Sequence, residues 1–254
     1  MELPINQIIN GDCLEVMKDW PDGCIDLICT DPPYGTTACE WDSIIPLEPM
    51  WEHLKRVIKP NGAIVMTASQ PFTTTLIASN MKMFKYCWVW EKNLKVGFLN
   101  ARKRPMVGHE DIPVFYAKNP VYNPQKRLRT VEVKSGNKKN SKPSVYGKQR
   151  EDYLDRQDDT INPDLIIRGV KCIHNSSGKV HPTQKPVALM EYLIKTYTNE
   201  GETVLDFAMG SGTTGVAAKN LNRDFIGIEL DEKYFQIAKT RMANKETLFD
   251  KVAS

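Results

Sequence analysis

The chain has 254 residues, 41% of them hydrophobic and 26% charged, which fits one globular α/β domain with room for a sizeable insertion. No apolar run approaches the roughly 18 residues that a transmembrane helix needs, and residues 1–12 lack the order of a secretion signal, so we expect a cytoplasmic protein. The six cysteines form no CxxC pair and have no histidine at finger-like spacing, which argues against a metal site and against a disulfide framework.

The net charge of +3 is unevenly distributed along the chain. Residues 118–150 contain ten lysines and arginines against one acid, Glu132, so that this segment carries a charge of +9. The remainder of the chain is therefore acidic overall. This asymmetry predicts a polyanion as a binding partner.

Short β-branched runs alternate with amphipathic stretches along most of the chain. In order, the pattern predicts a strand at 5–10, a helix at 13–20, a strand at 25–30, a helix at 50–58, a strand at 63–67, a helix at 72–81 and strands at 86–90 and 112–117. It resumes with a helix at 187–197, a strand at 203–206, a helix at 213–220, a strand at 225–229 and a helix from 233. Such alternation is typical of an α/β fold with a mostly parallel, doubly wound sheet.

Between about 119 and 180 this alternation stops, and Asn, Pro, Lys, Ser and Gly dominate the composition. A loop of this length inside a compact domain is usually functional or disordered. Tyr122, Tyr146 and Tyr153 are interleaved with its cations, which favours contact with nucleic acid over a plain spacer. We therefore expect an insertion at 119–180 that separates two parts of one domain, 1–118 and 181–254.

A glycine-rich turn follows the strand at 203–206. Glycines let the backbone approach a ligand closely, although tight structural turns share this pattern. Glu229 ends the next strand, 19 residues after Gly210, where a carboxylate can accept hydrogen bonds from both hydroxyls of a ribose. No Walker lysine follows the glycines, so a nucleoside cofactor is favoured over ATP phosphates. The predicted contacts are Asp206, Ala208, Gly210, Ser211, Gly212, Thr213, Glu229 and Leu230.

A second motif, Asp31-Pro32-Pro33-Tyr34-Gly35, directly follows the strand at 25–30. It lies at the carboxyl edge of the sheet, where open α/β sheets bind ligands. Two prolines fix the backbone, so that the Asp31 carboxylate and the neighbouring carbonyl point outward as acceptors beside the ring of Tyr34. A rigid turn with a capping aspartate is the purely structural alternative. We favour a catalytic role for Asp31, Pro32, Pro33 and Tyr34.

Fixed acceptors suit chemistry on an exocyclic amine of a base. The amine is a poor nucleophile because its lone pair is delocalised into the ring. The Asp31 carboxylate and the Pro32 carbonyl can hold both N–H bonds and favour a pyramidal nitrogen. Tyr34 can stack on the base, which must leave the duplex at a cost of a few kcal/mol.

Asp31 to Tyr34, followed far downstream by Asp206 to Thr214, resembles the amino-methylating DNA methyltransferases of the β class. The resemblance covers nearly the whole chain outside 119–180. It implies a Rossmann-like methyltransferase fold, S-adenosylmethionine as the cofactor and double-stranded DNA as the substrate, as in restriction–modification systems, and it allows a homodimer. It also implies that Asp12 and Cys13, in the opening motif at 11–15, lie near the adenine of the cofactor. Segment 181–186 resembles the part that meets the cofactor's methionine end, with the contacts Thr183, Gln184 and Lys185.

By the same resemblance, the insertion takes the place of the target-recognition region. The predicted DNA contacts there are Lys126, Arg127, Arg129, Lys138 and Lys139. Arg102 and Arg104, with His109 and Glu110, occupy positions where the family has residues near the extruded base and the DNA backbone. A solvated basic loop is the alternative for segment 102–105.

The chain departs from the family pattern in two ways. Phe207-Ala208-Met209 replaces the usual Pro-Phe, which shifts the aromatic ring by one position. We also expect that the chain lacks the C-terminal domain that some relatives carry. Family members with Asp-Pro-Pro-Tyr usually methylate adenine, whereas a serine in place of the aspartate is typical of cytosine-N4 enzymes.

The sequence therefore predicts an adenine-N6 DNA methyltransferase, with cytosine N4 as the alternative. No Pro-Cys nucleophile motif is present for C5 methylation. Methylation of RNA or of a protein glutamine is a further alternative, although the basic segment argues against a protein substrate. A non-enzymatic nucleic-acid-binding module would not need the two intact motifs.

Overall fold

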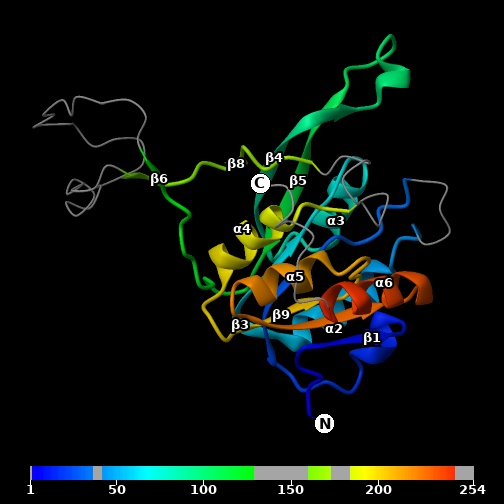
Figure 1. The fold of residues 1–254 in the computed structure, drawn as a ribbon, viewed down its shortest axis with the longest axis vertical. Coiled ribbons are helices and arrows are strands. Elements are labelled where there is room, and N and C mark those ends of the chain that lie inside the picture. Colours follow the sequence, from blue (N-terminus) through cyan, green and yellow to red (C-terminus); the bar gives the residue numbers. More distant parts are fainter. Residues whose placement is uncertain (1, 37–41, 129–159, 173–183, 244–254) are drawn as a thin grey trace, which may run out of the picture. The chain divides into compact units, whose positions relative to one another are not determined.

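The computed structural model describes residues 2–36, 42–128, 160–172 and 184–243. The chain divides into two compact units, one formed by Met1–Asn123 and Leu165–Ser254 and the other by Pro124–Asp164. Within the described residues of the second unit, β6 (Arg127–Leu128) and β7 (Thr160–Ile161) form an antiparallel ladder. The first unit contains the main sheet and the helices (Figure 1).

Eight strands form the main sheet, in the order β1-β10-β9-β2-β3-β5-β4-β8. Their bounds are β1 Gln7–Asn10, β2 Ile25–Thr30, β3 Ile58–Met66, β4 Phe84–Val96, β5 Val107–Phe115, β8 Ile166–Ile167, β9 Thr203–Asp206 and β10 Asp224–Glu229. Neighbours from β1 to β3 are parallel, β5 is antiparallel to both β3 and β4, and β8 is parallel to β4. The sheet is thus mostly parallel, as predicted.

Helices cover both faces of this sheet (Figure 1). Their bounds are α1 Cys13–Val16, α2 Leu47–Val57, α3 Phe72–Ser79, α4 Val187–Tyr197, α5 Thr213–Asn220 and α6 Glu232–Ala243. Side chains alternate across a strand, so Leu27 and Cys29 pack in the cluster with α4 and α5, while Ile28 packs in the cluster with α1, α2 and α3. This confirms the doubly wound α/β fold. None of these helices is long and apolar enough to span a membrane.

The hairpin of β4 and β5 is longer than predicted. β4 continues to Val96 and β5 begins at Val107, so residues 91–107, which we call the arm, extend beyond the body of the sheet (Figure 1). On the side that faces the arm, the predicted strands at 86–90 and 112–117 stop where burial ends. Much of the arm is exposed, so it lacks the apolar alternation that marks a half-buried strand.

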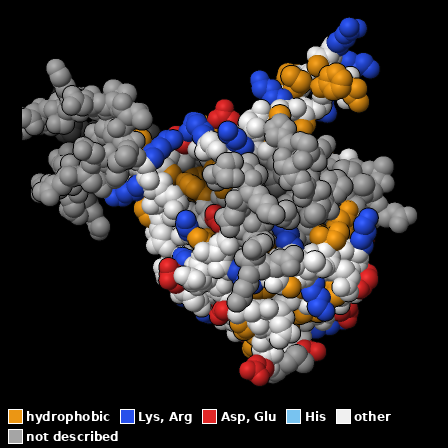
Figure 2. All heavy atoms as spheres, in the orientation of Figure 1, with side chains coloured by type: hydrophobic (Ala, Val, Ile, Leu, Met, Phe, Trp, Pro, Cys, Tyr) orange, Lys and Arg blue, Asp and Glu red, His pale blue; other side chains and the backbone are white. Residues whose placement is uncertain are grey.

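The tip of the arm is a short 3₁₀ helix, η1 (Phe98–Asn100), in which Phe98 is 73% exposed and Leu99 86% exposed. The space-filling view shows apolar side chains among Lys and Arg at the tip of the arm (Figure 2). The arm contains five Lys and Arg against one acid, Glu91. The arm therefore presents an apolar and cationic surface.

Other predicted bounds also differ from the structure. The helix predicted at 13–20 ends at Val16, and turns follow it up to Trp20. β3 begins at Ile58, whereas the predicted strand begins at 63. The predicted start is too late because Pro60-Asn61-Gly62 has the composition of a turn, although these residues belong to the strand. β8 lies inside the range 119–180 but pairs with β4 through Val89. The division of the domain at 119 and 180 stays a prediction.

Candidate active site

The two motifs meet in the middle of the sheet. β2, which leads into Asp31, lies beside β9, which ends in Asp206. The Thr30 hydroxyl donates a hydrogen bond of 2.6 Å to Oδ1 of Asp206 across 176 positions of sequence. Since both strands run in the same direction, their carboxyl ends open on the same edge, where there is a cavity of about 960 Å³.

Most of the predicted catalytic and cofactor-binding residues line this cavity. They are Asp12, Cys13, Asp31, Pro32, Pro33, Tyr34, Gln184, Lys185, Asp206, Ala208, Gly210, Ser211, Thr213, Glu229 and Leu230. Gly212 does not line it, and Thr183 lies outside the described residues. Phe207 and Met209 both do, so the residues that replace the family's Pro-Phe still face the predicted cofactor region.

Glu229 holds the glycine-rich turn in place. Its Oε2 accepts a hydrogen bond of 2.6 Å from the Gly210 amide, and its Oε1 accepts one of 2.9 Å from the Asp231 amide. Burial raises the pKa of the Glu229 carboxyl, and these two amides counteract the rise. Gly210 has φ +53°, and nothing lies within 4 Å of the position that a Cβ would take. The turn thus leaves open space beside a fixed carboxylate.

Asp206 is a buried carboxyl, only 3% exposed. Besides Thr30, it accepts a hydrogen bond of 3.2 Å from the Ala208 amide. Burial raises its pKa to about 6, although the hydrogen bonds from Thr214, Thr30 and Ala208 oppose the rise. Asp206 is therefore mostly ionised at neutral pH and adds negative charge to the floor of the cavity.

The opening motif borders the same cavity from α1. Asp12 caps this short helix by accepting a hydrogen bond of 2.8 Å from the Leu14 amide. Burial raises the pKa of the neighbouring Cys13 thiol to about 12, so this thiol stays protonated at neutral pH. A protonated thiol is a poor nucleophile, so Cys13 does not act as one, and its contact with the cofactor stays a prediction.

Asp31 is held by three side chains. Its Oδ1 accepts hydrogen bonds from the Tyr34 hydroxyl at 2.7 Å and from the Thr67 hydroxyl, while the Lys185 ammonium lies 2.7 Å from both carboxylate oxygens. Oδ2 thus accepts a hydrogen bond from Lys185, and the Asp31 side chain is 23% exposed. Asp31 is therefore firmly oriented and still accessible from the cavity.

Tyr34 lies in a turn that the Asp42 carboxylate stabilises. Asp42 accepts backbone hydrogen bonds from Tyr34, Gly35 and Thr36 at 2.8 to 2.9 Å, and the Phe72 ring stacks on Tyr34 at a centroid distance of 5.4 Å. Burial and the neighbouring Asp31 carboxylate raise the pKa of the Tyr34 phenol well above its usual value. Tyr34 is therefore a neutral donor with a fixed ring.

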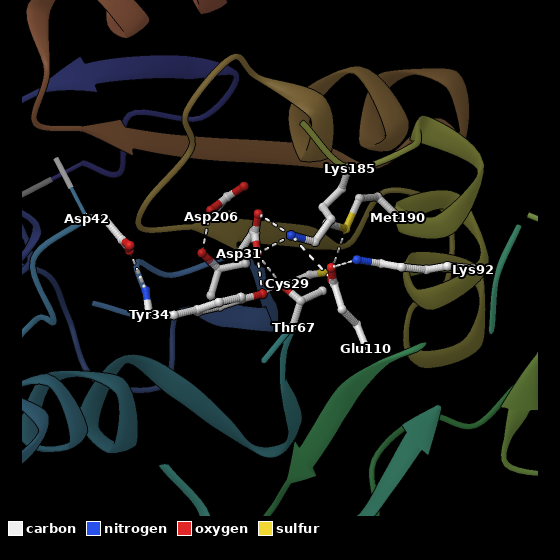
Figure 3. A network of polar contacts seen from close by, with 11 residues as sticks. Cys29, Asp31, Tyr34, Asp42, Thr67, Lys92, Glu110, Lys185, Met190 and Asp206 are labelled. Atoms are coloured by element: carbon white, nitrogen blue, oxygen red, sulfur yellow. Dashed lines mark hydrogen bonds and ion pairs between the residues drawn. The ribbon is translucent and has the colours of Figure 1, made fainter. Parts of the chain in front are cut away.

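Lys185 lies between two carboxylates, as Figure 3 shows. Its ammonium reaches Asp31 at 2.7 Å and Glu110 at 3.4 Å, and Glu110 in turn pairs with Lys92. Burial alone lowers the pKa of Lys185, but Asp31 and Glu110 outweigh it and raise the pKa above its usual value. The Lys185 ammonium is thus charged and engaged with Asp31, whereas the sequence resemblance predicts a cofactor contact.

Among the described residues, none of the predicted DNA contacts lines the cavity. Arg102 and Arg104 are in the turn at the tip of the arm, and neither lines the cavity. In the second unit, Lys126 is exposed and Arg127 forms an ion pair of 2.9 Å with Asp164. Arg129, Lys138 and Lys139 lie outside the described residues. All of these stay predictions.

Sequence reasoning missed the residues that support the site, namely Thr30, Asp42, Thr67 and Lys92. Thr30 and Thr67 each stand at the carboxyl end of a predicted strand, which is a signal that could have placed them at this edge. Asp42 and Lys92 have no such signal. Among the described residues, no group of three His, Cys, Asp or Glu is arranged to hold a metal ion.

Comparison with protein families agrees with this geometry. A family model described as DNA methylase, for the N6 and N4 amino-methylating enzymes, matches residues 25–240. This range contains both the Asp-Pro-Pro-Tyr turn and the glycine-rich turn. The chain therefore belongs to the N6-adenine/N4-cytosine DNA methylase family, and it is an amino DNA methyltransferase.

Individual relatives support the same assignment. The chain is 30% identical to the type II methyltransferase M.BglII of Bacillus subtilis, covering 92% of this chain and 68% of that protein. It is 29% identical to the type II methyltransferase M.HpaI of Haemophilus parainfluenzae, covering 97% and 77%.

Solved structures show the same fold. The structure of M1.HpyAVI in complex with SAM matches with a TM-score of 0.63 at 30% identity, covering 92% of this chain and 98% of that one. The cytosine-N4-specific PvuII DNA methyltransferase matches with a TM-score of 0.67 at 17% identity, covering 94% and 87%, which shows the fold alone. The Rossmann-like methyltransferase fold that the sequence predicts is thus confirmed.

Proposed function

We propose that the protein transfers a methyl group from S-adenosylmethionine to N6 of adenine within specific sequences of double-stranded DNA. The observation that carries this proposal is the Asp31 carboxylate, fixed by Tyr34, Thr67 and Lys185 at the edge of the cavity. The aspartate of the Asp-Pro-Pro-Tyr motif favours adenine over cytosine by the family tendency described above.

The cavity fits the cofactor. S-adenosylmethionine supplies an electrophilic methyl group on a positively charged sulfur. Glu229 is held at the end of β10 by the Gly210 and Asp231 amides, as an acceptor for ribose hydroxyls needs to be. Asp206 and Asp12 add carboxylates to the same cavity, which suits a ligand with a cationic centre. A relative at 30% identity has been solved as a SAM complex.

Asp31 and the proline that follows would orient the target amine. Oδ2 of Asp31 can accept one N–H bond, and the Pro32 carbonyl the other, which keeps the lone pair of the nitrogen free for the methyl group. The nitrogen becomes positively charged as it takes the methyl group and then loses one proton. Asp31 lies where it can stabilise this charge, accept the proton and pass it to water.

DNA contacts would come from two regions. Arg102 and Arg104 at the tip of the arm, together with the basic segment in 119–180, would neutralise phosphates. In this proposal 119–180 acts as the target-recognition region, and 1–118 with 181–254 forms the catalytic domain. Base-edge contacts from a few of these residues would then select the target sequence.

The test is mass spectrometry of nucleosides from unmethylated double-stranded DNA incubated with the protein and isotope-labelled S-adenosylmethionine. Labelled N6-methyladenine is the expected product, and Asp31→Ala serves as the inactive control. Labelled N4-methylcytosine would keep the mechanism and overturn the choice of base. Absence of label in DNA, with the cofactor still bound, would overturn the proposal and direct the search to RNA.

A further inference from the structure

Four charged side chains, each buried or half-buried, lie beside the cavity with positive and negative charges alternating from one to the next (Figure 3). We call these four residues the charge network. Lys92 of β4 pairs with Glu110 of β5, Glu110 lies 3.4 Å from Lys185, and Lys185 binds Asp31. Lys185 is 6% exposed and Glu110 11% exposed. Ionised groups this poorly hydrated are held by their partners, so we expect a change in one of them to affect the others.

The two carboxylates beside Lys185 are not equally satisfied. Lys185 donates hydrogen bonds of 2.7 Å to both oxygens of Asp31. Oε2 of Glu110, by contrast, is buried and has no hydrogen-bond partner among the described residues, although the Lys185 ammonium is only 3.4 Å away. A buried carboxylate oxygen without a hydrogen-bond donor lowers the stability of the fold. Oε2 of Glu110 can therefore accept a hydrogen bond from the same ammonium if the ammonium moves.

The position of Lys185 conflicts with the chemistry expected at Asp31. An amine that donates to Asp31 competes with an ammonium that already binds both carboxylate oxygens. The positive charge that develops on the nitrogen is also disfavoured by a second cation next to it. Both conflicts are relieved if the ammonium moves from Asp31 towards Glu110.

We propose that Lys185 is a positioning residue of the transfer step. It holds the Asp31 carboxylate in place before a base arrives and passes to Oε2 of Glu110 when the target amine binds Asp31. This proposal rests on the function proposed above. It assigns Lys185 to the catalytic carboxylate, in place of the cofactor contact implied by the sequence resemblance.

The test compares Lys185→Met, Lys185→Arg, Glu110→Gln and the double variant Lys185→Met with Glu110→Gln. Lys59→Met is the matched control, because Lys59 forms a 2.6 Å ion pair with Asp26 and does not line the cavity. Label transfer to unmethylated mixed-sequence genomic DNA gives kcat and KM. Calorimetry with S-adenosylmethionine alone gives its Kd and the number of intact sites, by which each rate is divided.

Lys185→Met should lower kcat per intact site about 100-fold with an unchanged KM for DNA, because Asp31 loses the cation that holds its carboxylate in place before the base arrives. The Kd for S-adenosylmethionine should stay within about twofold, which a cofactor contact would not allow. Lys185→Arg should recover about tenfold, because a guanidinium can also bridge two carboxylates. Glu110→Gln should also lower kcat, because the Lys185 ammonium loses the acceptor to which it moves. The double variant should have a kcat no lower than that of Lys185→Met, since both residues act in the same movement of the ammonium.

Two results would overturn the inference while the wild-type protein still methylates DNA. One is a Kd for S-adenosylmethionine raised about tenfold or more in Lys185→Met, with a normal rate at saturating cofactor, since this pattern defines a cofactor-binding residue. The other is a double variant whose loss equals the product of the two single losses, since independent residues behave in this way. If the wild-type protein labels no base in DNA, the proposed function itself fails.

Discussion

The buried carboxyl of Asp206 should make the protein less stable as the pH rises from 5 to 8. Its pKa is raised from 3.8 to about 6, mainly by burial, so the folded chain holds the proton more tightly than the unfolded chain does. Stability is therefore lost as the pH rises from about 4 through about 6, with a total of about 3 kcal/mol. About 1.4 kcal/mol of this loss falls between pH 5 and pH 8.

Asp206→Asn removes this titration but keeps an oxygen that can accept the 2.6 Å hydrogen bond from Thr30. Urea unfolding followed by circular dichroism, without cofactor, gives the free energy of unfolding of both proteins at each pH. The difference should move in favour of the variant by about 1.4 kcal/mol between pH 5 and pH 8. Asp19→Asn, at an exposed site, controls for the change in net charge. A difference that stays constant, or moves towards the wild-type protein, would refute the reasoning.

Three further predictions concern the site and the arm. Asp31→Ala should lose methyl transfer but keep S-adenosylmethionine affinity within about twofold by calorimetry, and equal loss of both would mean that its role is misassigned. Glu229→Ala should raise the Kd for S-adenosylmethionine about tenfold or more, because the Gly210 and Asp231 amides lose their acceptor. Glu232→Ala, at an exposed site, is the control. An unchanged Kd in Glu229→Ala would count against ribose binding. Arg102→Ala combined with Arg104→Ala should reduce the slope of log K against log salt for duplex DNA by about two, measured by fluorescence anisotropy, whereas the same slope would place the phosphate contacts elsewhere.

The core of the fold is predictable because buried positions carry apolar residues at the spacing of a strand or a helix. The structure has β2, β9, α4 and α5 at the predicted residues, since their side chains pack on the sheet and follow the strand or helix period. The glycine-rich turn and the Asp-Pro-Pro-Tyr turn are predictable for the same reason. Each follows a recognisable strand, and carboxyl ends of parallel strands share one edge.

The arm and the charge network could not be predicted in the same way. Strand residues such as Lys95 and Val96 have little to bury, so their order does not alternate. The contacts among Lys92, Glu110 and Lys185 join three separate segments, and a charged residue carries no sign of its partner in its own neighbourhood. Such pairs become visible only when the topology has brought the strands together.

The pairing of β2 with β9 also has a consequence for how the protein is made. Leu27 and Ile28 pair with Val204 and Leu205, so the centre of the sheet joins the first and last parts of the chain. Contacts this distant in sequence close a long loop and are slow to form. During synthesis β2 emerges long before its neighbour exists, and Asp31 and Asp206 cannot face the same cavity until then. A nascent chain thus has no assembled site to act on DNA.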